Sequence, residues 1–246
     1  MIELAKRKSR FGLITILQDE RKGSIVYLQA GFFQSEADRN GVSMVSYIHA
    51  IYDLLGQTDS RKILMIGCGG GTLATMLCKN GREVTVLDKD PQAFLLARKY
   101  FALPSGAICR VADGCEHLLS DPAVYDAIVL DAFVGDQIPA HLQSSAFFRL
   151  AQMHLSPRGC VLANVHVRDD LDNAPDRMAI RMAATWPDVR ILDTEGSTNR
   201  NAIVIAGETV RVTKPVLRVA PQISADEVDA ELRAMNFRPW READAA

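Results

Sequence analysis

Hydrophobic and polar positions follow two different rhythms along this chain. Up to about residue 35, apolar and β-branched residues form short runs at 11–17 and 24–28, separated by a charged turn at 19–23. Such runs predict a β-hairpin or a short meander. Because so small a unit cannot bury its own apolar faces, we expect it to pack on the rest of the chain or on a partner chain.

A helical rhythm replaces this pattern from residue 41 to residue 55, and Gly56 marks the predicted end of that helix. A polar linker, 58–62, follows it. We therefore predict an N-terminal unit, residues 1–58, made of strands and a connecting helix. Residues 59–246 would form a larger domain.

Strand and helix signals alternate beyond residue 62, which predicts a doubly wound α/β sheet. The predicted strands are the apolar runs 63–66, 83–87, 107–111, 126–130, 160–165, 190–192 and 202–205. Helices are expected between them, including one over 144–155. A capping-box pattern from Ser224 to Glu227 predicts a last amphipathic helix that runs to Met235. The stretch past Pro215 suggests no role beyond this packing helix.

Composition narrows the class of protein. The 246 residues carry 28 basic and 30 acidic side chains, a net charge of −2, which argues against a nucleic-acid partner. The basic cluster at residues 6–8 is expected to be a solvated terminus, and with Glu3 it interrupts any secretory signal. The longest uncharged stretch, 63–78, is broken by glycines and too short to span a membrane. Five cysteines without a CxxC pair favour a reducing, cytoplasmic compartment.

A glycine-rich turn follows the first strand of the alternating region. It contains Gly67, Gly69 and Gly71, in the pattern G-x-G-x-G. Glycines there let a ligand approach the backbone, and the following helix offers free N–H groups. A dinucleotide fold would need Gly or Ala where Thr72 stands, so the pattern instead resembles motif I of S-adenosylmethionine-dependent enzymes. A tight turn without a ligand is the alternative.

Two acids strengthen the prediction of a ligand. Asp88 ends the second strand, where an acid can accept both ribose hydroxyls, and Asp113-Gly114 ends the third, where an acid can accept from an adenine amino group. The carboxyl ends of parallel strands converge at one edge, so we expect an adenosyl nucleoside between these acids. A helix cap or solvated loop acid for Asp88, and an Asp-Gly turn for Asp113, are the alternatives.

From about residue 11 to residue 167 the chain resembles spermidine synthase, and more closely the bacterial spermidine synthase-like proteins. The motifs that carry the resemblance are Gln34-Ser35, Tyr47 and the segments 66–71, 86–91, 97–104, 112–114, 125–133, 138–142 and 155–159. It implies a seven-stranded, Rossmann-like sheet of the S-adenosylmethionine-dependent methyltransferase type, a small N-terminal β-unit and a homodimer.

The resemblance also assigns roles to residues. It implies that Gln34 contacts the methionine-derived part of the cofactor, Asp88 holds the ribose and Asp113 reads the adenine. Asp131 would lie beside an incoming amine and help take its proton, and Tyr47 is a second candidate catalytic residue. The cofactor would be S-adenosylmethionine or its decarboxylated form, and the acceptor a small amine or another small molecule.

Asp131 also has an argument of its own. It closes the apolar strand 126–130 at the same edge as the glycine turn, and an amine must be neutral to attack a sulfonium-activated carbon. A strand-end cap is the alternative for Asp131, and a core or rim aromatic for Tyr47. His49 and His141 lack metal-ligand spacing, so we expect surface or core histidines and no metal.

The chain departs from the spermidine synthases where charge matters most. Gly70 stands where the family has an aspartate, which would pair with the ammonium of decarboxylated S-adenosylmethionine and repel the carboxylate of the intact form. Ile48 and His49 replace a polar residue and an acid of the polyamine site, and Val134 replaces a second acid. Asp136, two positions later, is a candidate substitute.

Three functions therefore stay open at this point. One is an aminopropyltransferase with an altered amine site, and the second is a methyltransferase that uses intact S-adenosylmethionine on a small molecule. The third is a non-catalytic nucleoside-binding dimer, while Thr72 disfavours a nicotinamide dehydrogenase.

Overall fold

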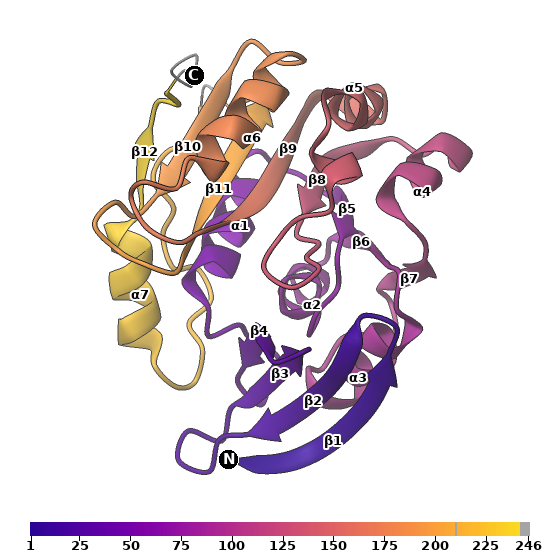
Figure 1. Ribbon diagram of the computed structural model, residues 1–246, viewed down its shortest axis with the longest axis vertical. Coiled ribbons are helices and arrows are strands. Elements are labelled where there is room, and N and C mark those ends of the chain that lie inside the picture. The colour runs from indigo at the N-terminus through magenta and orange to yellow at the C-terminus, as the bar shows by residue number, and fades with distance from the viewer. Residues whose placement is uncertain (210, 242–246) are drawn as a thin grey trace.

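Two β-sheets make up the protein in a computed structural model that describes residues 1–209 and 211–241. The smaller sheet is antiparallel, in the order β1-β2-β3-β4, and lies below the larger one in Figure 1. Its strands are β1 (Ile2–Ser9), β2 (Gly12–Gln18), β3 (Ile25–Gln29) and β4 (Phe32–Ala37). The predicted meander is confirmed, and β1 adds a strand that the pattern did not indicate. The basic cluster at 6–8 lies in β1 and is exposed, as expected for solvated side chains.

The larger sheet has the order β12-β10-β11-β9-β8-β5-β6-β7, and all its pairs from β7 to β9 are parallel. Strand β11 is antiparallel to β9 and β10, and β12 is antiparallel to β10. The strands are β5 (Lys62–Ile66), β6 (Glu83–Asp88), β7 (Ile108–Val111), β8 (Tyr125–Leu130), β9 (Leu155–Val167), β10 (Val189–Asp193), β11 (Arg200–Gly207) and β12 (Asn236–Arg238). The doubly wound sheet is confirmed, with β12 as an eighth strand at its edge.

Helices cover both faces of this sheet (Figure 1). One core lies between the sheet and α1 (Ser46–Gln57), α2 (Thr72–Lys79), α3 (Pro91–Tyr100) and α7 (Ala225–Ala234). The other lies between the sheet and α4 (Gly114–Ser120), α5 (Ser145–Met153) and α6 (Ala174–Ala183). The short helix η1 (Ala140–Gln143) precedes α5. None of the helices in the described part of the chain is long and apolar enough to cross a membrane.

The small sheet packs on α3 and the turn after it. Ile14, Ile16 and Tyr27 share a core with Leu96 and Phe101, so part of the apolar face that needed cover is buried against the chain itself. This contact places β4 beside the glycine turn, which is the feature that matters for the site. The division into residues 1–58 and 59–246 and the homodimer stay predictions.

Three local expectations were wrong. The helix predicted from residue 41 begins at Ser46, because residues 42–44 pair with the end of β4: Asp38 donates its N–H to the carbonyl of Val42, and Met44 donates its N–H to the carbonyl of Glu36 (both 2.9 Å). Ser224 has a left-handed backbone and makes no side-chain cap, so the capping box does not form. The helix expected over 144–155 ends at Met153, and β9 begins at Leu155.

Candidate functional site

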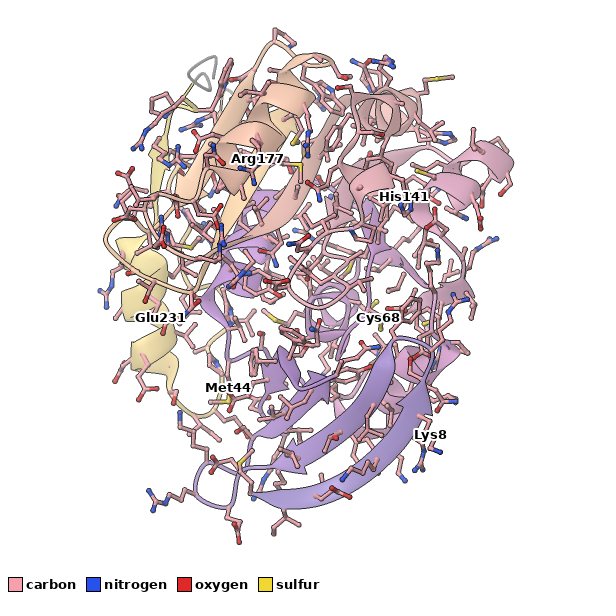
Figure 2. All side chains as sticks on the ribbon, in the orientation of Figure 1. Lys8, Met44, Cys68, His141, Arg177 and Glu231 are labelled. Atoms are coloured by element: carbon pink, nitrogen blue, oxygen red, sulfur yellow. The ribbon has the colours of Figure 1, made fainter. Side chains whose placement is uncertain are left out.

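The glycine turn joins the ends of three strands. Gly67 donates its N–H to the carbonyl of Leu87 (2.8 Å), and Asp131 donates its N–H to the carbonyl of Ile66 (2.9 Å). A Cβ atom at Gly67, whose φ is +105°, would lie 2.0 Å from the Asp131 carbonyl oxygen. Only glycine therefore lets β5 and β8 end so close together. Figure 2 places Cys68, in the same turn, between the large sheet and the N-terminal sheet.

The turn leads directly into α2. Gly71 is the N-cap residue of this helix with φ +68°, and no side chain caps the first turn. The helix therefore presents N–H groups and the positive end of its dipole without a competing side-chain acceptor. An electron-rich ligand group at this edge of the sheet would meet them.

A cavity of about 200 Å³ lies beside the turn, and we name it the nucleoside cavity after the ligand that the sequence predicts. Its apolar walls come from Ile66, Leu87, Ala112, Val134, Pro139 and Leu142. Asp88 and Asp113 both line it, as the convergence of strand ends predicted. Apolar walls with a few polar groups at the rim are the usual construction of a small-molecule site.

Asp88 is fixed by backbone groups. Its carboxylate accepts the N–H of Cys68 (3.0 Å) and the N–H of Asp90 (2.8 Å). Burial raises the pKa of Asp88, although these two hydrogen bonds act in the opposite direction. Each carboxylate oxygen has two lone pairs, so Asp88 keeps acceptor capacity for a ligand hydroxyl.

Asp113 is more heavily engaged. One oxygen accepts the N–H of Cys115 and caps α4 (2.9 Å), and the other accepts from His141 Nε2 (2.8 Å) and Lys89 Nζ (3.3 Å). Burial opposes ionisation, but the His141, Cys115 and Lys89 hydrogen bonds outweigh it and hold the pKa of Asp113 below its ordinary value. Asp113 therefore caps α4 as well as lining the cavity, whereas the sequence offered an Asp-Gly turn as its alternative role. Gly114 packs on β5, where a Cβ atom would lie 2.9 Å from Ile66 side-chain atoms.

Asp113, Cys115 and His141 offer ligand atoms that all lie within 4.8 Å of one another. A borderline metal such as zinc takes this set of ligands. The ammonium of Lys89, however, already lies 3.3 Å from Asp113 Oδ2, where it would repel a divalent cation. The arrangement fits an ion pair better than a metal centre.

Asp131 stands at the end of β8, where two side chains donate to it. Asn164 Nδ2 lies 2.8 Å from Oδ1, and Tyr47 Oη lies 3.4 Å from Oδ2. Burial raises the pKa of Asp131, and both hydrogen bonds lower it by a smaller amount. Burial and the neighbouring Asp131 charge also raise the pKa of Tyr47 well above its ordinary value, so Tyr47 is a phenol that donates.

A second cavity of about 530 Å³ is also lined by Asp131, and we name it the acceptor cavity after the acceptor that the resemblance predicts. The residues common to both cavities are Gln34, Cys68, Gly69, Asp131 and Phe133. The two cavities therefore adjoin where the glycine turn, β4 and the end of β8 meet. Gln34, Tyr47 and Asp131, chosen on the resemblance, all line the acceptor cavity.

Gly70 is a packing position in this arrangement. Its N–H donates to Ser35 Oγ (2.9 Å), and a Cβ atom would lie 2.9 Å from the Phe101 ring and 3.0 Å from Ser35 Cβ. The space that an aspartate side chain would need is thus filled by the N-terminal sheet and the turn after α3. The glycine at position 70, where the spermidine synthases have an aspartate, is therefore the residue that fits the packing around it.

The sequence analysis did not assign a site role to two residues that hydrogen-bond the acids of the site, Asn164 and His141. Asn164 is buried in β9, where it links Asp131 to Asn201 Nδ2 (2.9 Å). Its signal was a lone amide inside the apolar run 160–165, a position that usually implies a buried hydrogen-bond partner. His141 was expected on the surface or in the core; its side chain is half exposed and pairs with Asp113.

Comparisons with known proteins agree with this fold and motif set. The family model described as methyltransferase small domain matches residues 26–169, and the chain belongs to this family. A polyamine aminopropyltransferase of Chromobacterium violaceum is 33% identical over 127 residues, which cover 49% of each chain. The chain thus spans about half the length of this curated relative. The resemblance to the polyamine aminopropyltransferases is confirmed.

Solved structures agree at the level of the fold. A probable spermidine synthase from Corynebacterium glutamicum has a TM-score of 0.76 at 18% identity and matches 96% of this chain and 90% of that one. A spermidine synthase in complex with the transition state analogue AdoDATO has a TM-score of 0.67 at 20% identity, over 93% and 85% of the two chains. The methyltransferase-type fold is confirmed.

Proposed function

We propose that the protein is a transferase that moves an alkyl group from an S-adenosylmethionine-type donor to a small amine, with Asp131 as the proton acceptor. The observation that carries the proposal is the position of Asp131. Asp131 lines both cavities and so lies where the two adjoin.

The donor's adenosine would occupy the nucleoside cavity. Asp88 would accept the ribose hydroxyls with its remaining lone pairs, and the apolar walls would enclose the base. Asp113 would face the adenine through the side that His141 and Lys89 leave open. The backbone of Gly67, Gly69 and Gly71 would let the donor approach the sheet edge, and Gln34 would hold the rest of the donor between the cavities.

The donor supplies an electrophilic carbon on a positively charged sulfur. Asp131 would hold the incoming ammonium, accept a proton from it and leave a neutral amine with a free lone pair. When the amine nitrogen forms its bond to carbon, the carbon–sulfur bond breaks and its electron pair stays on sulfur, giving a neutral thioether. Because its pKa is raised, Asp131 is a stronger base than an ordinary carboxylate.

Tyr47 and Asn164 would serve as positioning residues for this step. Both donate to Asp131, one to each oxygen, which fixes the plane of the carboxylate between the cavities. A fixed carboxylate aligns the amine with the reacting carbon, and alignment is a major part of enzymatic rate enhancement.

The similarity to polyamine aminopropyltransferases favours an aminopropyl group from decarboxylated S-adenosylmethionine, with an amine as acceptor. Asp131 lines the acceptor cavity, where a carboxylate would bind the ammonium of an amine. Methyl transfer from the intact donor is the second candidate. The packing around Gly70 favours it, because no acid stands there to repel the donor's carboxylate.

A donor-by-acceptor experiment tests the proposal. The protein is incubated with intact or decarboxylated S-adenosylmethionine and a panel of amines, and the thioether product is quantified. We expect amine-dependent release of 5′-methylthioadenosine from the decarboxylated donor. Release of S-adenosylhomocysteine from the intact donor would select methyl transfer. If neither donor binds or reacts, the chain is a scaffold and the proposal fails.

A further inference from the structure

The floor of the acceptor cavity is a ladder of polar side chains. Asn164, His166 and Arg168 follow one another at alternate positions along β9 and just past its end, so they share one face of the strand. All three line the cavity. Since a strand advances about 3.3 Å per residue, the ladder runs about 13 Å away from Asp131.

The neighbouring strand extends the same floor. Asn201 on β11 is the partner of His166, and Asn199 donates its N–H to the carbonyl of Arg168 (2.9 Å). Both asparagines line the acceptor cavity. The floor thus carries amides and an imidazole, and a guanidinium stands at its outer end.

A groove of about 210 Å³ continues from that outer end, and it adds a second guanidinium. It shares His166 and Arg168 with the acceptor cavity and is also lined by Arg177 from α6, which Figure 2 labels. Asp172 in this groove is held by Arg168 Nε (3.0 Å). Among the described lining residues, Asp136 is the other acid at the outer end, and its charge helps to raise the pKa of Arg168.

The charged side chains differ between the two ends of the acceptor cavity. At the inner end, Asp131 is a carboxylate that only neutral side chains contact, Tyr47 and Asn164. At the outer end, the side chain of Asp172 is buried and already accepts from Arg168 and from the N–H of Ala174, so Arg168 and Arg177 outnumber Asp136 among the charged lining groups that a ligand can contact. A second ammonium on the acceptor would meet guanidinium groups there, and like charges in a confined site cost affinity.

We propose that the acceptor is an amine that carries an anionic group at its far end, with the amine at Asp131 and the anion at Arg168 and Arg177. This inference rests on the proposed function, because it assumes that Asp131 receives an amine. It separates this chain from enzymes whose acceptors are cationic at both ends.

Binding of matched probes tests the inference. The protein is saturated with 5′-methylthioadenosine and titrated by calorimetry with 6-aminohexanoate, cadaverine and hexylamine, and then with 4-aminobutyrate, putrescine and butylamine. We expect an amino carboxylate to bind at least about tenfold more tightly than the corresponding diamine and monoamine. A diamine that binds most tightly, or equal affinity for all three classes, would overturn the inference.

Arginine variants identify the residue responsible. Arg168→Gln should lose about tenfold in affinity for the amino carboxylate while its affinity for the monoamine is unchanged. Arg168→Glu should invert the preference towards the diamine, and Arg168→Lys should keep the wild-type preference. Arg149→Gln, an exposed arginine on α5 outside both cavities, is the matched control.

The two proposals fail differently. Turnover of diamines that depends on Asp131 would uphold the transferase and overturn the anionic acceptor. Absence of binding and of turnover with every amine class would overturn both. An Arg168→Gln variant that weakens all three classes equally would show a structural effect and also overturn the inference.

Discussion

Replacing Asp131 with Asn separates stability from activity at one side chain. The amide is nearly isosteric with the carboxylate. Its oxygen can accept from Asn164, which now lies 2.8 Å away, and its NH₂ can donate to the Tyr47 hydroxyl. The substitution therefore removes a negative charge and keeps the packing.

The raised pKa of Asp131 fixes the sign of the stability change. Between the unfolded and folded pKa values the folded state binds more protons, so the stability that this group contributes is present at low pH. It is lost as pH rises through the folded pKa. At neutral pH the ionised Asp131 therefore lowers the free energy of unfolding. The decrease is about 1.4 kcal/mol for each unit by which folding raises its pKa. Asp131→Asn should therefore unfold at the same or a higher temperature than the wild type at pH 7.

Activity should change in the opposite direction. A positioned general base contributes about 10²–10⁴-fold, and the neutral amide cannot accept the amine's proton. Thioether release should fall by at least about 100-fold in Asp131→Asn. In the wild type, activity should fall on the acid side of a pKa that lies above the ordinary carboxyl range.

Paired measurements of unfolding temperature and turnover check this reasoning, with Asp59→Asn as the matched control because Asp59 is exposed and outside both cavities. The control should leave turnover unchanged. A clear loss of stability in Asp131→Asn, or turnover within about threefold of the wild type, would refute the argument.

Two further substitutions test the surroundings of the site. Gly70→Ala places a methyl group 2.9 Å from the Phe101 ring and should lower the free energy of unfolding, measured by chemical denaturation, by about 1–3 kcal/mol. Gly106→Ala is the control: Gly106 has open space around it, so the substitution should be neutral or stabilising. Equal effects of the two substitutions would contradict the packing argument. Tyr47→Phe removes a donor from Asp131, so the acid limb of the pH–rate profile should move to higher pH; an unchanged limb would remove Tyr47 from the mechanism.

Periodicity predicted the central strands well because they are buried on both faces. Strands such as β5 and β8 are continuous apolar runs, and the positions of their ends follow from the glycine or acid that comes next. The edges were harder to predict. Strand β1 is mostly exposed and β12 is three residues long, so neither shows the apolar pattern of a buried strand.

The candidate site was predictable where it depends on strand ends, and not where it depends on pairing across the sheet. Asp88 and Asp113 meet at one cavity because parallel strands end on the same edge. The hydrogen bond from Tyr47 to Asp131 joins positions 84 residues apart, and only the resemblance suggested that both belong to one site. The pairing of His141 with Asp113 depends on how the loop after β8 folds back, which no local pattern encodes.

The central claim is that an adenosyl nucleoside binds at the glycine turn against Asp88. Calorimetric titration of 5′-methylthioadenosine into wild type, Asp88→Asn and Glu83→Gln tests it most directly, because Glu83 is an exposed acid at the opposite end of the same strand. We expect the wild type and Glu83→Gln to bind equally and Asp88→Asn to bind at least about tenfold more weakly, since it loses charge-assisted hydrogen bonds to the ribose. No binding by the wild type, or equal binding by all three proteins, would contradict the account.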